Sequence, residues 1–435
     1  MQIKMKRTLK YILVLLLATG ISASVNGQTE ELSLDRAIIK AMENNYGIRI
    51  SDADSDIASI NNSWGNAGAL PTIGFTASSL NSAGVINNST TTSRLTSGVA
   101  LRWTIFDGFR VTLTKDKLGM LEDLSAGKGA ITVENTLEAV ILAYYDVLLQ
   151  KERLKVVETV MNLSKDRYDY ELIRQEIGKS LTYNVLLAKN SYLTDRASFL
   201  NQEVTLRNAV RNLNYILGEE AGASWIFTEP FTPVTDLYIL SDLREKMVSD
   251  NRSLRNQYIN LLLSKNETEI RKGDFLPALS LTGGADNSNT LYGTNSGFSN
   301  GTVTGYANIS FTYDIYQAGS RKRALEIARI NEEIADIQID QMIHSLTNQL
   351  FSVYDLYNVR RELFDLAGES LEAAQLNMEI AEDKYKSGAI NSFNYRDIQL
   401  IYLNSALQKL QATYNLIGSN SALTRLTGGF VNSGE

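Results

Sequence analysis

The sequence contains no cysteine, and this absence excludes several kinds of site and scaffold. A disulfide framework, thiol catalysis and thiolate metal sites all require cysteine. There is a single histidine, His344, with no carboxylate cluster beside it, so we interpret it as a helix surface residue. Glycine-rich phosphate loops, nucleophile elbows and paired metal-ligand spacings are also missing. We therefore expect no catalytic residues, no cofactor and no bound metal, and so no enzyme.

Positive charge and proline are both scarce. The formal net charge is −7 and no basic patch or arm occurs, which argues against a nucleic-acid partner. Only four prolines are present: Pro71 and Pro277 open two similar segments, and Pro230 and Pro233 lie between the halves of the chain. Because proline interrupts helices, the proline-free runs 110–217 and 320–427 can be helical over unusual lengths.

Long hydrophobic runs are missing once the first residues are passed. Residues 1–27 begin with a cluster of lysine and arginine, continue as an apolar run to Val25 and end in small residues. This order predicts a secretory signal peptide. The apolar run is shorter than the roughly 20 residues that a membrane-spanning helix needs. Since no cysteine follows it, a lipid-modified N-terminus is excluded.

The sequence does contain an internal repeat. AYYDVLLQKERL at 143–154 matches SVYDLYNVRREL at 352–363, and LPTIGFT at 70–76 matches LPALSLT at 276–282. A half-length repeat with a nearly constant offset indicates a duplicated structural unit. We expect a first repeat over 28–218, a linker over 219–240, a second repeat over 241–428 and a tail over 429–435.

Each repeat has a helical period and one clear break. Leu137, Ile141, Tyr144 and Leu148 step by four, three and four, and the second repeat has the same steps, a heptad-like seam. The breaks fall at Gly178 and Gly388, and the helices after them are much shorter than those before. The helical segments that precede the strands, 33–66 and 241–273, supply the missing length. We therefore predict one continuous and one two-piece helix in each half.

The remaining segments alternate as strands do. We expect strands at about 72–82, 96–106, 278–284 and 305–316, with polar loops over 81–95 and 283–305. One face is apolar and aromatic and the other is polar, as in a membrane barrel strand. A soluble sheet packed on a core also alternates, but the long polar connectors favour the membrane interpretation. The residues expected to face lipid are Val99, Leu101, Trp103, Ile105, Ile309, Phe311 and Tyr313.

Four strands cannot close a membrane barrel, because single-chain barrels begin at about eight strands. Open strand edges are not tolerated in lipid, so the chain must oligomerise. Three copies satisfy this requirement, and a dimer or a tetramer is also permitted.

The combined pattern resembles the TolC family of outer-membrane efflux proteins. The motifs Ile105-Phe106-Asp107-Gly108 and Tyr385-Lys386-Ser387-Gly388 carry the resemblance, together with the duplicated topology. It implies a mainly α fold with a small membrane β-barrel, in which a homotrimer forms a barrel in the outer membrane and an α-helical tunnel in the periplasm. Its implied partners are outer-membrane lipid, a periplasmic adaptor (membrane fusion) protein and an inner-membrane pump.

The resemblance also implies two sites at the helical tips. The adaptor-docking residues would be Gly178, Lys179, Ser180, Gly388, Ala389 and Ile390. At the periplasmic gate Tyr385 and Asp397 match the family pattern, whereas Asn394 and Asn184 stand where family members carry acids. We expect neutral hydrogen bonds such as Tyr385 to Asn184 to hold the gate closed, and a ring of Asp397 carboxylates to favour cations. The alternative is that Asp397 is an ordinary solvated helix residue.

Three functions fit the sequence. The first is the outer-membrane channel of a tripartite efflux pump for small molecules, and the second is the duct of a type I protein secretion system. The third, a soluble periplasmic coiled-coil adaptor, would be expected to have one helical hairpin and no amphipathic aromatic strands. The duplicated strand pairs therefore count against the adaptor.

Overall fold

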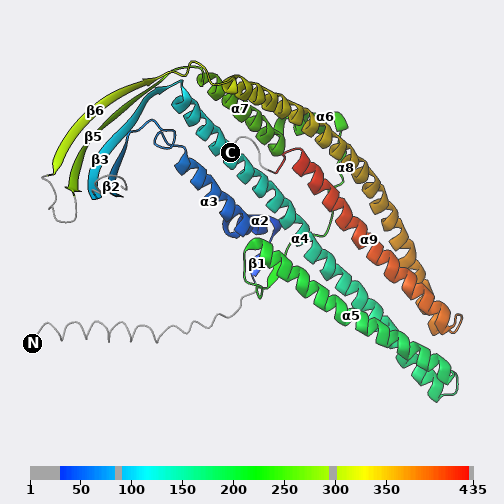
Figure 1. Ribbon diagram of the computed structural model, residues 1–435. Helices are drawn as coiled ribbons and strands as arrows, with labels where there is room; N and C mark the ends of the chain where they lie inside the picture. Colours follow the sequence, from blue (N-terminus) through cyan, green and yellow to red (C-terminus); the bar gives the residue numbers. More distant parts are fainter. Residues whose placement is uncertain (1–29, 84–90, 293–300, 431–435) are drawn as a thin grey trace, which may run out of the picture.

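The computed structural model describes residues 30–83, 91–292 and 301–430. The predicted signal peptide lies outside these ranges. Figure 1 shows an elongated molecule with a curved sheet at one end and long helices running away from it. The elements in chain order are β1 (Glu30–Leu32), α2 (Leu34–Asn44), α3 (Tyr46–Asn61), β2 (Thr72–Ala83), β3 (Thr91–Asp107), α4 (Arg110–Glu176), α5 (Thr182–Leu217), β4 (Trp225–Phe227), α6 (Leu240–Asp250), α7 (Arg252–Gly273), β5 (Ala278–Tyr292), β6 (Thr302–Thr312), α8 (Ser320–Lys386) and α9 (Ser392–Leu426).

The long helices predicted from the proline-free runs are present. α4 and α8 each contain 67 residues without a break, which corresponds to roughly 100 Å. α4 packs against α3 and α5 and also against α7 and α9 of the second repeat. The predicted fold class, mainly helical with a small sheet built from a duplicated unit, is confirmed.

The helical segments before the strands differ from the prediction. Each was expected to be one helix, but the first breaks at Asn45 and the second at Asn251, where the backbone is extended. Each asparagine caps the following helix through its side-chain oxygen. Its amide nitrogen donates to the C-terminal end of the last helix in its repeat: Asn45 to the Ile216 carbonyl at 2.8 Å, Asn251 to the Leu426 carbonyl at 3.1 Å. These hydrogen bonds attach the junction of α2 and α3 to α5, and the junction of α6 and α7 to α9.

The sheet has the strand order β2-β3-β5-β6, antiparallel throughout. β3 starts at Thr91 and β5 continues to Tyr292, so the described residues of the expected polar loops over 81–95 and 283–305 are strand, except for Gly301. The sequence analysis missed these ends of β3 and β5 because asparagine and glycine have low strand propensity. Pairing between β3 and β5 nevertheless extends to Thr92 and Tyr292.

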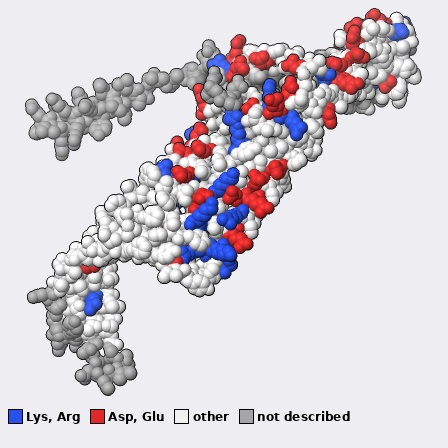
Figure 2. Space-filling view, turned by 90° about the horizontal axis from the view of Figure 1, so that it is seen from above, with Lys and Arg blue, Asp and Glu red and all other residues white. Residues whose placement is uncertain are grey.

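The register separates the two faces of the sheet. Directly paired residues point to the same side of a sheet, and the apolar pairs Phe75 with Val99, Trp103 with Leu281, and Leu279 with Phe311 share one side. The opposite side carries the charged side chains of the four strands, which are Arg94, Arg102, Asp107 and Asp286. Figure 2 shows that the sheet is almost free of charge compared with the helices.

Two of the residues predicted on the apolar strand face occupy different positions. Ile105 lies in a bulge between Thr104 and Phe106 and has no partner in β5, so Phe106 takes the place opposite Leu279. Tyr313 follows the last residue of β6 and belongs to the turn before α8. Val99, Leu101, Trp103, Ile309 and Phe311 lie within their strands, in register with the other apolar side chains.

The cores lie midway along the helices. One packs Tyr144 of α4 against Leu32 of β1 and Leu213 of α5, and another packs Tyr357 of α8 against Met247 and Leu416. The linker crosses these cores: the Tyr357 hydroxyl donates to the Asp236 carbonyl at 2.7 Å. Within the described ranges, every helix is too short or too polar to cross a lipid bilayer.

Candidate functional site at the helical tips

The tips are the two tight turns at the end of the molecule opposite the sheet (Figure 1). Gly178 has φ +70° between α4 and α5, and Gly388 has φ +81° between α8 and α9. No atom lies within 4 Å of an added Cβ at either position, so glycine is needed for its backbone conformation and not for space.

Most of the predicted tip residues are exposed. Gly178, Lys179, Gly388 and Ala389 lie on the surface, whereas Ser180 and Ile390 are half-buried. The Ser180 hydroxyl donates to the Glu171 carboxylate, and Ile390 packs on an aromatic cluster at the tip.

Large apolar side chains also lie on the tip surface. Ile177 and Leu181 flank the first turn, and Phe393, which the sequence analysis did not single out, follows the second with 70% of its surface exposed. The tip is therefore an apolar surface around two glycine turns.

The sequence analysis expected a hydrogen bond from Tyr385 to Asn184, but Tyr385 has a different partner. Its hydroxyl donates to the Glu171 Oε1 at 2.7 Å, and both side chains are buried. Asn184 lies in the first turn of α5, whereas the helix next to the Tyr385 hydroxyl is α4. The acceptor is a carboxylate, so this contact between the repeats is charge-assisted and not neutral.

Arg167 is a second buried link between the repeats. Its Nη1 donates to the Ser392 carbonyl at 3.1 Å, while Nε and Nη2 are buried without a hydrogen-bond partner in the described part of the chain. Burial, and to a lesser extent the nearby Arg396 charge, lower the pKa of Arg167. The cation is thus held in the tip at a cost in solvation.

A buried ion pair lies between α5 and α9. The Arg396 guanidinium donates to both Asp195 carboxylate oxygens, at 2.7 and 2.8 Å, and to the Ser164 hydroxyl of α4 at 2.9 Å. Only 7% of the Asp195 side chain and 16% of the Arg396 side chain are exposed. Asp195, Arg396 and Ser164 therefore connect α5, α9 and α4, which come from both repeats.

The sequence carries a signal for Asp195 that the analysis did not use. Val185 and Ala188 are buried on α5, and Asp195 follows Ala188 by two turns on the same face. A charge at a core-facing position needs a partner, since an unpaired buried charge is costly.

Stacked tyrosines fill the space between these groups. The Tyr385 and Tyr395 rings lie 4.6 Å apart at 7°, and Tyr170 meets Tyr385 edge-on at 5.2 Å. Burial, followed by the Glu382 charge, raises the pKa of Tyr395 to about 12. Burial and the hydrogen bond to Glu171 also raise the pKa of Tyr385.

These raised pKa values predict how tip stability depends on pH. A tyrosine whose folded-state pKa is raised is favoured in its neutral form, so its stabilisation is complete below the ordinary pKa of 10.0. The Tyr395 contribution should be lost as pH rises from 10.0 to about 12. Hydrogen exchange at the α8 and α9 tip should accelerate over this range, and Tyr395→Phe should make the change less steep. Exposed Tyr183→Phe is the control, and an equal effect there would contradict the assignment.

The bond between Tyr385 and Glu171 gives a second expectation. Hydrogen bonds to charged groups contribute about 1.5–3 kcal/mol, so Tyr385→Phe should lower the free energy of local opening at the tip by that amount. Tyr170→Phe is the matched control, because its hydroxyl donates to the Lys386 carbonyl at 3.2 Å in an exposed position. Native-state hydrogen exchange measures both, and equal losses would show that Glu171 adds nothing.

The other predicted gate residues lie on the surface. Asp397 and Asn394 of α9 are exposed. Within the described residues the Asp397 carboxylate makes no hydrogen bond or ion pair, and the Asn394 side chain makes no hydrogen bond. Within the described chain, Asp397 therefore makes no hydrogen bond with Tyr385, whose hydroxyl donates to Glu171.

The comparisons with known proteins agree with this architecture. Residues 243–429 match the sequence profile of a family described as "Outer membrane efflux protein". No curated protein matches the chain in sequence.

Solved outer-membrane channels have the same fold. The CmeC channel of Campylobacter jejuni superimposes with a TM-score of 0.73 at 16% identity, covering 92% of this chain and 87% of that one. VceC of Vibrio cholerae gives 0.71 at 14%, with coverages of 91% and 96%. The MtrE channel of Neisseria gonorrhoeae, solved in its open state, gives 0.71 at 15%, with coverages of 91% and 89%. Residues 243–429, in the second repeat, therefore match the outer membrane efflux protein family in sequence, and the whole chain has the fold of these solved channels.

Proposed function

We propose that the protein is the outer-membrane channel of a tripartite efflux pump, which exports small molecules across the periplasm and the outer membrane without catalysing a reaction. The observation that carries this proposal is the two-faced sheet. Its apolar pairs share one side and its charged side chains share the other, as a wall between lipid and water requires. The helices then extend from the sheet as the periplasmic tunnel (Figure 1).

Oligomerisation is part of this proposal. β2 and β6 are the edge strands of a four-stranded sheet, and open edges are not tolerated in lipid. α8 also exposes an apolar stripe at helical spacing, which includes Ile327, Ile330 and Ile334. A homotrimer would pair each β6 with a neighbouring β2 and cover these stripes.

The tips are the proposed docking surface for a periplasmic adaptor protein, which would connect the channel to an inner-membrane pump. Exposed Ile177, Leu181 and Phe393 around the glycine turns suit an apolar partner helix. A type I protein secretion duct would use the same features, so the cargo decides between the two functions.

A deletion strain tests the proposed function. Loss of an efflux channel should raise the accumulation of small toxic compounds, and the protein itself should fractionate with the outer membrane. Unchanged compound accumulation together with loss of a secreted protein would support type I secretion. Recovery of the protein from the soluble periplasm would overturn the channel.

Asp397 is proposed to line the narrow end of the tunnel. Its carboxylate is exposed in one chain, and three copies around an axis would form an acidic ring that favours cations. In planar bilayers Asp397→Ala should weaken cation selectivity and block by divalent ions. The control is Glu379→Ala, because Glu379 is an exposed acid about two turns before the end of α8. Unchanged selectivity in Asp397→Ala would place the constriction elsewhere.

A further inference from the structure

The turn between β6 and α8 exposes large apolar side chains. Ile315 and Tyr316 are 89% and 83% exposed, and Tyr313 is 52% exposed. The turn lies where the sheet meets the helices (Figure 1). In a membrane protein, aromatic side chains at such a level mark the boundary between hydrocarbon and water.

The first turn of α8 concentrates positive charge beside these side chains. Arg321, Lys322 and Arg323 follow one another, and the turn contains no acidic residue. The N-terminus of a helix is already the positive end of its dipole, so cations there are unfavourable unless an anion is bound nearby. The equivalent helix of the first repeat, α4, begins with a single cation, Arg110.

Arg321 has partners within the chain. Its Nη1 donates to the Asp274 carbonyl at 3.0 Å, and its guanidinium lies over the Phe275 ring at 5.7 Å. Lys322 and Arg323 are exposed, and among the described residues neither has an ion-pair partner.

Two of the acids at this level already have cationic partners. Asp274 pairs with Arg110 and, at 3.5 Å, with Arg271, and Glu269 pairs with Lys272 at 2.6 Å. Asp314 in the turn accepts a hydrogen bond from the Gln317 amide and Glu326 lies one turn further along α8, but among the described residues neither carboxylate forms an ion pair with Lys322 or Arg323.

We infer that Lys322 and Arg323 bind the phosphate of anionic phospholipid head groups in the periplasmic leaflet of the outer membrane. This inference rests on the proposed membrane location. Lysine, arginine and a helix N-terminus all favour phosphate, and each cation close to an anionic membrane surface adds about fivefold to binding. Free phosphate would satisfy the charge but would leave Ile315 and Tyr316 in water. A lipid covers the apolar side chains and neutralises the cations at the same time.

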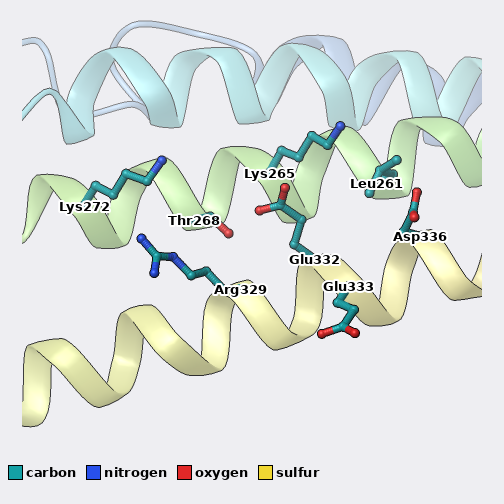
Figure 3. Close-up of a pocket in the computed structure, with 8 residues that line it drawn as sticks. All are labelled: Leu261, Lys265, Thr268, Lys272, Arg329, Glu332, Glu333 and Asp336. Atoms are coloured by element: carbon teal, nitrogen blue, oxygen red, sulfur yellow. The ribbon is translucent and has the colours of Figure 1, made fainter.

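The groove between α7 and α8 supplies a matched control pair. Figure 3 shows Lys265 on α7 and Arg329 on α8. Both cations are exposed and lie farther from the sheet than Lys322 and Arg323, Arg329 on the same helix and Lys265 on its neighbour α7. Lys265→Gln/Arg329→Gln therefore changes the net charge as much as Lys322→Gln/Arg323→Gln does, but below the expected head-group level.

The test uses the full-length oligomer in nanodiscs of an equal mixture of phosphatidylethanolamine and phosphatidylglycerol. Native mass spectrometry of the released protein measures which lipid it retains. The unmodified protein should retain phosphatidylglycerol preferentially, and Lys322→Gln/Arg323→Gln should reduce that preference about fivefold for each cation removed. The groove variant should retain the preference.

Three results would overturn the inference. They are an unchanged preference in Lys322→Gln/Arg323→Gln, an equal loss in the groove variant, and complete displacement of phosphatidylglycerol by inorganic phosphate. A protein that fails to enter nanodiscs at all would contradict the proposed function as well. A protein that enters and conducts but shows no lipid preference contradicts this inference alone.

Discussion

Asp195→Ala should destabilise the helical tips by about 3–5 kcal/mol, the largest loss that we expect from any single side chain there. The change removes both oxygens that the Arg396 guanidinium binds at 2.7 and 2.8 Å. Arg396 would then be a cation with 16% of its side chain exposed and only the Ser164 hydroxyl as a partner. Because Asp195 and Arg396 lie on helices of different repeats, the loss should appear as separation of α9 from α5. Hydrogen exchange and limited proteolysis at the tips measure it.

Two further variants separate the ion pair from a general effect of mutation at the tips. Asp195→Leu/Arg396→Met replaces both charges with apolar side chains and should recover most of the lost stability, since a buried pair is often matched by hydrophobic residues. Lys386→Ala breaks the pair with Glu382, whose side chains are 65% and 40% exposed, and should change stability by less than about 1 kcal/mol. If Asp195→Ala behaves like Lys386→Ala, the buried pair does not hold the tips together.

Phe311→Lys should impair assembly of the protein in the outer membrane. Phe311 lies on the apolar side of β6 opposite Leu279 and one residue before the end of the strand, so a lysine there would face lipid close to the interface and cost up to about 1 kcal/mol. Ser310→Lys is the control, because Ser310 pairs with Ser280 on the other side of the sheet and would face water. The measurement is the amount of folded oligomer in the outer-membrane fraction.

The same contrast is expected for Trp103→Lys and Thr104→Lys on β3, but it is less clean there. The Trp103 indole nitrogen donates to the Ala69 carbonyl at 2.9 Å, so its loss also breaks a hydrogen bond. Equal tolerance of lysine at Phe311 and Ser310 would contradict the assignment of the apolar face to lipid.

The sequence predicted those parts of the fold that depend on local patterns. The proline-free runs and the heptad-like spacing of Leu346, Leu350 and Val353 led to one unbroken helix, and α8 is unbroken. The alternation around Trp103 led to an amphipathic strand, and the register keeps its neighbours on one side. The break at Asn251 was missed because no proline or glycine marks it. Its asparagine is a strong helix cap that the sequence analysis did not use.

The tip chemistry was harder to predict, because it depends on which side chains meet across distant segments. Tyr385 was identified correctly as a link to the first repeat, but its partner is Glu171 and not Asn184. Periodicity shows which face of a helix is buried, not which residue of a neighbouring helix faces it. Asp195 and Arg396 are 201 positions apart, and only the packing of α5 near α9 shows that they pair.

Reconstitution of the purified oligomer into planar bilayers tests the central claim most directly. A channel formed by several copies of this chain should produce discrete steps of ionic current. Asp195→Ala and Tyr385→Phe should raise the fraction of time spent open, because both loosen the contacts between the repeats at the tips. Flotation with vesicles shows independently whether the three proteins have inserted into the membrane. If all three insert and none of them then carries current, the proposal that this protein is a membrane channel is contradicted.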